Sequence, residues 1–297
     1  MNTAALIRRF PSLFLSHGSP MTALEAHETG PFWQQLGRSL EARHGRPKAI
    51  LIISAHTAAR QPVLLAGPRH EAIYDFGGFD PRLRSLRYDA PGAPALALEV
   101  QALAAQAGIT VHSLPQGGLD HGIWVPLRAM YPGADIPVLP LAFVPSQSPS
   151  QQFALGEALQ SLTETQGVLV IGSGSLTHNL GLVFAGGQMP PIDAPELPAS
   201  AEFREWWEAR SLARDWQALL DYRQQAPHAV DMHPSDEHLL PWFVAAGAAG
   251  RTHAPQRIHS ALTYGSLGMD AYAFGPEAQG LAEALAATSP AESQGKD

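Results

Sequence analysis

The sequence predicts an α/β fold: a single domain with three layers, in which helices cover both sides of a mostly parallel central sheet. Short β-branched or leucine-rich runs alternate with longer helical patterns along the 297 residues, and such alternation is typical of parallel strands joined by helices. Two runs, Ala49–Ser54 and Gly167–Gly172, are apolar on both faces, as central strands are. Hydrophobic residues make up 45% of the chain, enough for a sizeable core.

The expected elements follow these patterns in chain order. The strands are Ser12–Leu15, Ala49–Ser54, Val63–Ala66, Val138–Phe143, Gly167–Gly172, Ile258–Thr263 and Ala271–Phe274. The helices are Phe32–His44, Ala95–Ala107, Gln151–Thr163, Ala199–Leu220 and Glu237–Gly247. We expect residues 1–275 to form the catalytic domain, and residues 276–297 to form a C-terminal tail with a short helix followed by disorder.

Composition excludes several classes of function. The formal net charge is −8 and the basic residues are scattered, so a nucleic-acid partner is not expected. The chain has no cysteine, which excludes disulfides, iron–sulfur clusters and thiolate zinc sites, and any metal must be held by His, Asp or Glu. No apolar run approaches the roughly 20 residues of a membrane span. We expect a cytoplasmic protein that acts as a monomer or small homo-oligomer.

Three histidines stand where expected strands end. His17, His56 and His178 each lie beside small residues just past such a strand. In open α/β sheets, ligands bind beyond the carboxyl ends of the strands. Neutral imidazole is a good ligand for Fe(II), Zn(II) and similar metals. One such histidine is more often a packing or surface residue, but three together favour a metal site.

Two further segments fit the same site. Asp120-His121-Gly122 lies in an expected glycine-rich loop, and the run from His233 to His238 is expected to begin a helix, with Ser235 or Asp236 as its cap. The remaining histidines, His27 among them, are expected at the surface or in packing contacts. The run 172–176 does not match a nucleophile elbow, and the zincin pattern H-E-x-x-H is absent.

Taken together, the motifs resemble the class III extradiol ring-cleavage dioxygenases over about residues 11 to 275. The similarity is greatest to the single-domain DOPA 4,5-dioxygenase type, which is related to the catalytic subunit of protocatechuate 4,5-dioxygenase. The matching segments are Phe-Leu-Ser-His-Gly-Ser-Pro (14–20), Ile-Ser-Ala-His (53–56), Tyr-Asp-Phe-Gly-Gly-Phe (74–79), Leu-Asp-His-Gly-Ile-Trp (119–124), Gly-Ser-Gly-Ser-Leu-Thr-His-Asn-Leu (172–180), His-Pro-Ser-Asp-Glu-His-Leu-Leu-Pro (233–241) and Tyr-Gly-Ser-Leu-Gly-Met (264–269). Their joint order and spacing are specific.

The resemblance implies a mononuclear metal centre that opens a catechol with O2. Its ligands on this chain would be His17, His56 and His238. His178 would be an additional ligand or the acid–base group, and His121 would line the oxygen side of the pocket. The substrate-binding residues are expected to be Ser19, Asp75 and Tyr264, while Glu237 and His233 would support the ligands or replace one of them. Fe(II) would serve activity, and Zn(II) is an ion that all-histidine sites capture during purification.

Two other functions fit a histidine-rich site on this fold. A Zn-dependent hydrolase would use the same residues to activate water, and it would consume no oxygen. A non-catalytic metal-binding relative would have lost its acid–base residues. The presence of both His121 and His178 disfavours the second alternative.

Overall fold

The computed structural model describes residues 9–25 and 27–288, and its centre is one eight-stranded sheet. The strands of this sheet are β1 (Ser12–Ser16), β2 (Ala49–Ser54), β3 (Val63–Leu65), β6 (His112–Leu114), β7 (Val138–Ala142), β8 (Val168–Gly174), β9 (Gln256–His259) and β12 (Ala271–Phe274). Two short pairs lie outside it: β4 (Arg69–His70) with β5 (Ala90–Pro91), and β10 (Leu262–Thr263) with β11 (Leu267–Gly268).

The four central strands of the sheet are parallel. The strand order is β6-β3-β7-β2-β8-β1-β12-β9, and β7, β2, β8 and β1 all run in the same direction. Antiparallel pairing occurs toward the edges, where β3 meets β7 and β12 meets β1 and β9. The carboxyl ends of β1, β2 and β8 therefore lie side by side, because Leu15 pairs with Ser173 and Ser54 pairs with that same residue.

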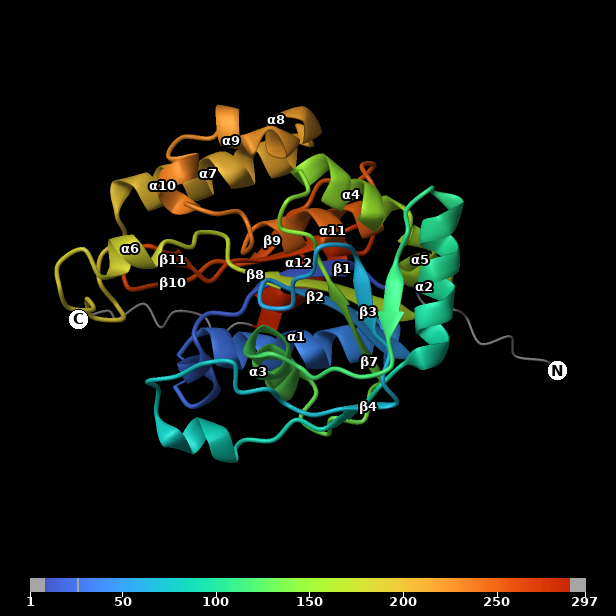
Figure 1. Cartoon of the computed structure of the whole chain (residues 1–297). Helices are drawn as coiled ribbons and strands as arrows, with labels where there is room; N and C mark the ends of the chain where they lie inside the picture. The colour runs from blue at the N-terminus through green and yellow to red at the C-terminus, as the bar shows by residue number, and fades with distance from the viewer. Residues whose placement is uncertain (1–8, 26, 289–297) are drawn as a thin grey trace.

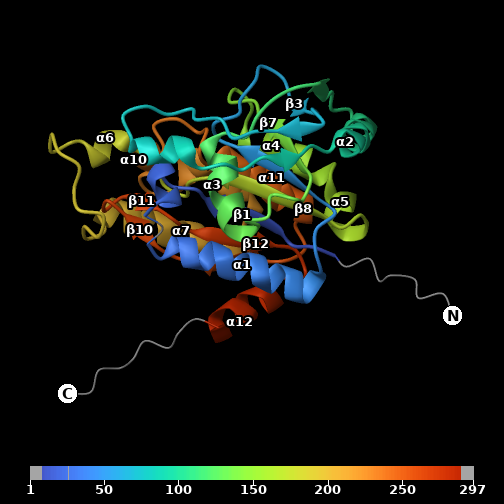
Figure 2. The same cartoon turned by 90° about the horizontal axis from the view of Figure 1, so that it is seen from below.

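Helices cover both faces of the sheet, as Figures 1 and 2 show. Their bounds are η1 (Pro20–Ala23), α1 (Thr29–His44), η2 (Pro81–Ser85), α2 (Pro94–Gln106), α3 (His121–Met130), α4 (Pro149–Glu157), α5 (Gln160–Thr165), α6 (Leu180–Val183), α7 (Pro198–Ala213), α8 (Trp216–Leu220), α9 (Tyr222–Gln225), α10 (Ala229–Met232), α11 (Leu240–Ala249) and α12 (Ala278–Thr288), with η denoting 3₁₀ helices. One core joins the sheet to α2, α4, α7 and α11, and the other joins it to α1, α3 and α12. The predicted three-layer α/β/α class is confirmed.

Strand β2 shows why a central strand does not alternate polar and apolar residues. Leu51 and Ile53 enter the core on the α11 side, while Ile50 and Ile52 enter the core on the α1 side. All four side chains are fully buried. Successive strand residues face opposite sides of a sheet, so a strand covered on both faces must be apolar throughout.

Several predicted boundaries were wrong, mostly because one pattern covers two elements. The helix expected over Gln151–Thr163 is α4 followed by α5, and the helix expected over Ala199–Leu220 breaks at Arg214, whose φ of 56° is left-handed. The strand expected over Ile258–Thr263 divides into β9 and β10, which belong to different sheets.

Two errors concern the site itself. His121 and Gly122, which were expected in a loop, begin helix α3. Conversely, His238 lies in the turn before α11, which begins at Leu240, so the segment from His233 is not helical and α11 has no side-chain cap. In the segment that was expected to form a C-terminal tail, helix α12 packs against the domain, with Leu281 and Leu285 buried. The disorder expected at the chain end concerns residues 289–297, which lie outside the described ones.

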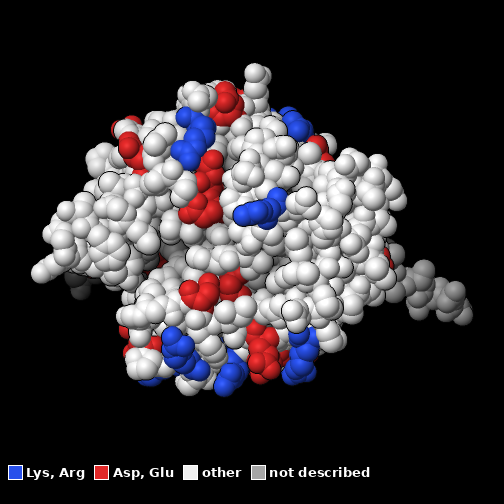
Figure 3. All heavy atoms as spheres, in the orientation of Figure 1, with Lys and Arg blue, Asp and Glu red and all other residues white. Residues whose placement is uncertain are grey.

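The surface carries mixed charge on the face drawn in Figure 3, where acidic and basic groups lie interspersed around a central hollow. Within the described residues, no helix is both long and apolar enough to cross a membrane.

Close packing of α11 on α4 depends on glycine. A Cβ added at Gly247 would lie 2.1 Å from the carbonyl oxygen of Phe153, and one added at Gly156 would lie 2.2 Å from that of Val244. Both separations are far below a normal contact, so the two helix backbones meet directly. We expect Gly247→Ala to lower the free energy of unfolding by about 1–3 kcal/mol, through forced separation of the helices.

Chemical denaturation would measure that loss, with Gly186→Ala as the matched control. A Cβ at Gly186 would meet no atom within 4 Å, so this variant should unfold at the wild-type midpoint. Equal midpoints for the two variants would contradict the packing argument.

Candidate metal centre

Five histidines from five parts of the chain converge at the carboxyl edge of the sheet. His17 follows β1, His56 follows β2, His121 begins α3, and His178 and His238 lie in the loops after β8 and before α11. The ring centroids of His17 lie 4.9, 5.3 and 5.5 Å from those of His56, His121 and His238. The His178 ring stacks on His238 at 3.5 Å with an interplanar angle of 11°. The parallel strands thus bring together side chains that are up to 221 positions apart in the sequence.

Glycines in β8 allow His238 to reach this edge. A Cβ at Gly174 would lie 1.9 Å from the carbonyl oxygen of His238, and one at Gly172 would lie 2.2 Å from that of Pro241. The amide of Ser175 donates a 2.9 Å hydrogen bond to the same His238 carbonyl. The backbone before α11 therefore lies directly against β8, and only glycine leaves room for it.

The hydrogen bonds of His17 determine which of its nitrogens is free. Its Nδ1 lies 3.0 Å from Ser173 Oγ, whose own proton is donated to the carbonyl of Gly122. Ser173 Oγ must therefore accept from His17 Nδ1–H, which leaves Nε2 of the neutral ring with an unprotonated lone pair. That Nε2 faces His56 Nε2 at 3.0 Å.

Glutamate and aspartate orient two more rings in the same way. Glu237 Oε1 lies 3.2 Å from His238 Nδ1, and this hydrogen bond, as the largest cause, lowers the pKa of Glu237 to about 2. Asp75 lies 3.0 Å from His121 Nδ1 and also accepts the His121 backbone N–H at 3.1 Å. An ionised carboxylate only accepts, so both Nδ1 atoms carry protons and both Nε2 atoms are free in the neutral rings.

Two sets of potential ligand atoms lie close enough to hold an ion. One set is His17, His56 and His121, and the other is His178, Glu237 and His238; within each set the atoms are within 4.8 Å of one another. The expected ligand set of His17, His56 and His238 draws on both. The ring of His238 lies 5.1 Å from that of His56, so the two sets are neighbours around one centre.

Burial keeps the cluster neutral. Desolvation, followed by the neighbouring histidines, holds the pKa of His17 well below its ordinary 6.5 and lowers that of His56 to about 3. Desolvation and then His238 lower the pKa of His178 from the ordinary 6.5 to about 3. Neutral imidazoles are the protonation state that binds a metal.

His233 is directed away from these ligand sets. Its Nε2–H donates to the carbonyl of Leu176 at 2.8 Å, and its ring is fully buried beside Phe203. The amide of His178 donates to the carbonyl of Met232 at 2.9 Å. The segment at 232–233 therefore holds the loop that carries His178, which is a supporting role rather than that of a ligand.

A buried acid that the sequence reading left without a role also supports the site. Asp120 accepts hydrogen bonds from Ser54 Oγ at 2.7 Å and from Thr57 Oγ1 at 2.5 Å, and these two residues flank His56 in sequence. Burial, the largest cause, raises the pKa of Asp120. Its place beside His121 in the sequence is the signal that pointed to this residue, since the acid anchors α3 to the end of β2.

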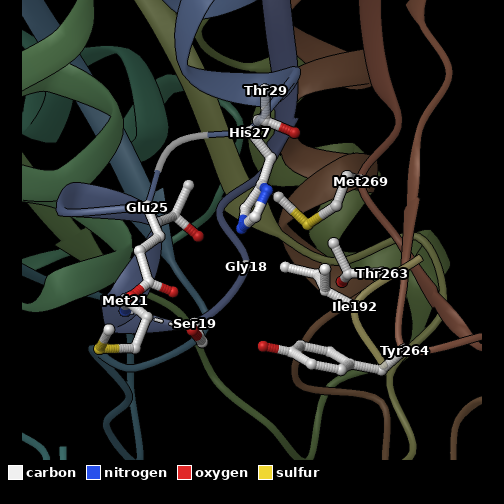
Figure 4. Close-up of a pocket in the computed structure, with 11 residues that line it drawn as sticks. Gly18, Ser19, Met21, Glu25, His27, Thr29, Ile192, Thr263, Tyr264 and Met269 are labelled. Atoms are coloured by element: carbon white, nitrogen blue, oxygen red, sulfur yellow. Dashed lines mark hydrogen bonds between the residues drawn. The ribbon is translucent and has the colours of Figure 1, made fainter. Parts of the chain in front are cut away.

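The residues expected to bind substrate separate into two places. Asp75 lies inside the cluster, bonded to His121. Ser19 and Tyr264 line a separate pocket next to Gly18 (Figure 4), and so does His27, which was expected at the surface or in packing contacts. No local pattern at His27 indicates this position, because the pocket forms between η1 and the β10–β11 hairpin.

Comparison with known proteins defines the class. The family model described as the catalytic LigB subunit of aromatic ring-opening dioxygenase matches residues 11–275. The chain belongs to this family and is an extradiol ring-cleavage dioxygenase, as the sequence motifs indicated.

Curated relatives and a solved structure agree with this assignment. The chain is 37% identical to a protein of Beta vulgaris named 4,5-DOPA dioxygenase extradiol, over 89% of this chain and 96% of that one. It is 35% identical to a protein of the same name from Escherichia coli K12, over 81% and 85% of the two chains. A crystal structure of an uncharacterized protein from Escherichia coli K12 superposes with a TM-score of 0.72 at 31% identity, covering 90% of this chain and all of that one.

Removal of the Ser173 hydroxyl tests the orientation of His17. We expect Ser173→Ala to weaken metal binding by about 10–100-fold, because His17 Nδ1 loses the acceptor that fixes its tautomer. Equilibrium metal titration against a competing chelator would measure the change. Ser113→Ala, in the exposed strand β6, is the control and should bind metal as the wild type does. Unchanged affinity in Ser173→Ala would contradict the tautomer argument.

Acid should destabilise the metal-free protein through its buried histidines. The pKa of His233 falls to about 4 in the folded protein, mainly through burial, and those of His56 and His178 fall to about 3. Because the unfolded chain takes up protons first, this stabilisation is complete above pH 6.5 and is lost as the pH falls toward about 3. His233 alone accounts for about 3 kcal/mol over this range. Urea unfolding at a series of pH values should show the decline, and a flat profile between pH 6.5 and 4 would contradict it.

Proposed function

We propose that this chain holds one Fe(II) ion at the histidine cluster and uses it to open the ring of a catechol with O2. The observation that carries the proposal is the outward direction of the Nδ1 protons of His17, His121 and His238. Each of these protons is bonded to Ser173, Asp75 or Glu237, so the opposite nitrogens are free for a common cation.

The donor set fits a divalent metal of the first transition row. His17 Nε2 and His56 Nε2 approach to 3.0 Å, a separation at which one cation can be bound by both nitrogens. We propose His17, His56 and His238 as the ligands, with His121 and His178 flanking them. When bound, the metal supplies the site that orients catechol and O2 and transfers electron density between them. Imidazole also suits Zn(II), which has no redox chemistry, so a zinc-loaded form would be inactive as an oxygenase.

His178 is the residue proposed to move a proton. Its ring is neutral, partly exposed and not engaged by a carboxylate of its own, so it can accept the proton of a catechol hydroxyl at the mouth of the cluster. The negative charge of the bound catecholate would raise its basicity above the metal-free value. Its stacking on His238 keeps the imidazole beside the ligand set, and the protonated ring can then return its proton as the ring opens.

His121 is proposed to line the oxygen side of the pocket. Asp75 fixes its ring through Nδ1 and the backbone N–H, so Nε2 faces the other histidines at a centroid distance of 4.0 Å from His56. His121 would therefore help to orient O2, and its position does not depend on the loop of His178.

The relatives support a substrate class, because their names give DOPA as their catechol. We propose a catechol with an aliphatic side chain as the substrate of this chain, and a ring-opened semialdehyde acid as its product. We further propose that the enzyme acts in the cytoplasm as a monomer or small homo-oligomer, with residues 1–275 as its catalytic domain.

The decisive experiment is anaerobic reconstitution with Fe(II), followed by exposure to a panel of catechols under measurement of dissolved oxygen and visible absorbance. Oxygen uptake equal to the catechol consumed, with a new visible band, is the expected result. Iron bound at one ion per chain without oxygen uptake from any catechol would favour the zinc hydrolase instead.

Substitution separates ligand from base. We expect His56→Ala to lose bound metal, measured by elemental analysis, because a ligand nitrogen at the centre is removed. His178→Ala should retain metal and lose turnover by about 100-fold or more, the usual contribution of a general base. Full metal occupancy in the first variant, or wild-type turnover in the second, would reject the corresponding role. His112→Ala, in an exposed strand, is the control for both.

A further inference from the structure

A small pocket lies next to the metal centre, between a segment that continues from His17 and a hairpin that is bonded to the residue before His178. Gly18 and Ser19 follow His17 and form one wall. The opposite wall is the β10–β11 hairpin, which is bound to the residue before His178: Thr177 Oγ1 donates to the carbonyl of Ser266 at 2.8 Å and accepts from the amide of Gly268 at 2.7 Å. The two walls of the pocket are therefore joined to the loops that carry His17 and His178.

Two residues of this pocket adopt a backbone conformation that side chains avoid. Tyr264 has a φ of 55° and His27 a φ of 40°, and both line the pocket. The described residues include only three other non-glycine residues of this kind, Ala134, Arg214 and His228. Such strain persists only where the surroundings impose it, and it gathers at ligand sites. Here it is imposed partly by the amide of Tyr264, which donates to the carbonyl of Ile192 at 2.9 Å.

The polar groups of the pocket are suited to a cation. Figure 4 shows the Tyr264 phenol pointing across the pocket toward Ser19 and Glu25. Glu25 is the one carboxylate among the lining residues, and no lysine or arginine lines the pocket. Burial raises the pKa of Tyr264, and the nearby Glu25 carboxylate raises it further. Arg82 is the basic residue whose pKa is raised by Asp80 and, to a smaller extent, by Glu25. Its guanidinium donates two hydrogen bonds to Asp80, at 3.0 and 2.7 Å, so its main partner is Asp80 rather than Glu25.

The size of the pocket restricts what can enter it. The pocket opens to solvent, and its volume is about 20 Å³, which is room for roughly one water-sized group. An aromatic ring or a branched chain exceeds this volume. A primary ammonium is of the right size, and its three N–H donors match the oxygens of Ser19, Glu25 and Tyr264.

We propose that this pocket selects catechols whose ring side chain ends in an ammonium group and disfavours those whose side chain ends in a carboxylate. Glu25 supplies the charge, and Tyr264 and Ser19 supply the remaining acceptors. This inference rests on the proposed catechol substrate, and it specifies in addition the charge at the end of that substrate's side chain.

The test compares three catechols that bear an aminoethyl, a carboxymethyl or a propyl group at the same ring position. Isothermal calorimetry under anaerobic conditions on the Zn(II)-loaded protein measures their affinities without turnover, because zinc has no redox chemistry. We expect the aminoethyl compound to bind most tightly. Glu25→Gln should lower the ratio of aminoethyl to propyl affinity by about fivefold at low ionic strength, as for a solvent-exposed ion pair, and added salt should reduce the ratio in the wild type.

Glu28→Gln is the matched control. Glu28 carries the same charge three residues away, is exposed, and does not line this pocket, so a general change in the electrostatic field would appear in both variants. Tyr264→Phe should weaken binding of the aminoethyl compound alone. With the Fe(II) enzyme, the preference for the aminoethyl over the propyl compound should appear as a difference in KM rather than in kcat.

Two failures are distinguishable. Binding of all three catechols with a ratio that Glu25→Gln leaves unchanged, or that Glu28→Gln lowers equally, would overturn the charge selection and leave the proposed reaction intact. Binding of none of them, including the neutral propyl compound, would reject the proposed function and the selection together.

Discussion

Direct contact between the backbone of His238 and strand β8 is the constraint on which the site depends. Gly172 and Gly174 carry no side chain, so the turn before α11 lies against the strand, with the Ser175 amide bonded to the His238 carbonyl. Any side chain at Gly174 would push this turn away by more than an ångström. His238 would then leave its stacking contact with His178 and its place beside His17. Packing of one helix entry thus brings together the two sets of ligand atoms.

The chemistry of the cluster follows from hydrogen bonds on its outside. Ser173, Asp75 and Glu237 each accept the Nδ1 proton of one histidine. Their effect is to select one tautomer, and burial then keeps the rings neutral. Two of these acceptors are carboxylates and one is a hydroxyl, so the charge around the centre is unequal. The carboxylates lie behind His121 and His238, and the neutral acceptor lies behind His17, at the base of the site.

The neighbouring pocket places the proposed selection of substrate at the same edge of the sheet as the proposed reaction. One wall continues from His17 and the other is bonded to Thr177, which precedes His178, so in our proposal a substrate held at the centre would meet Glu25 and Tyr264. The left-handed backbone at Tyr264 and His27 agrees with this role, and at Tyr264 it is held by the amide hydrogen bond to the distant carbonyl of Ile192.

The sequence by itself determined the fold class, the central strands and the candidate ligands. Strands such as Ala49–Ser54 are apolar on both faces, and a histidine just past such a strand can only lie at the sheet edge. Local pattern could not reveal the break at Arg214, the helix that starts at His121, or the non-helical turn before Leu240, because tertiary contacts override local preference there. Nor could it assign His233 to the Leu176 carbonyl, Asp120 to Ser54, or His27 to the pocket. Hydrogen-bond partners and pocket walls join residues distant along the chain, and only the packed sheet and its helices decide which of them meet.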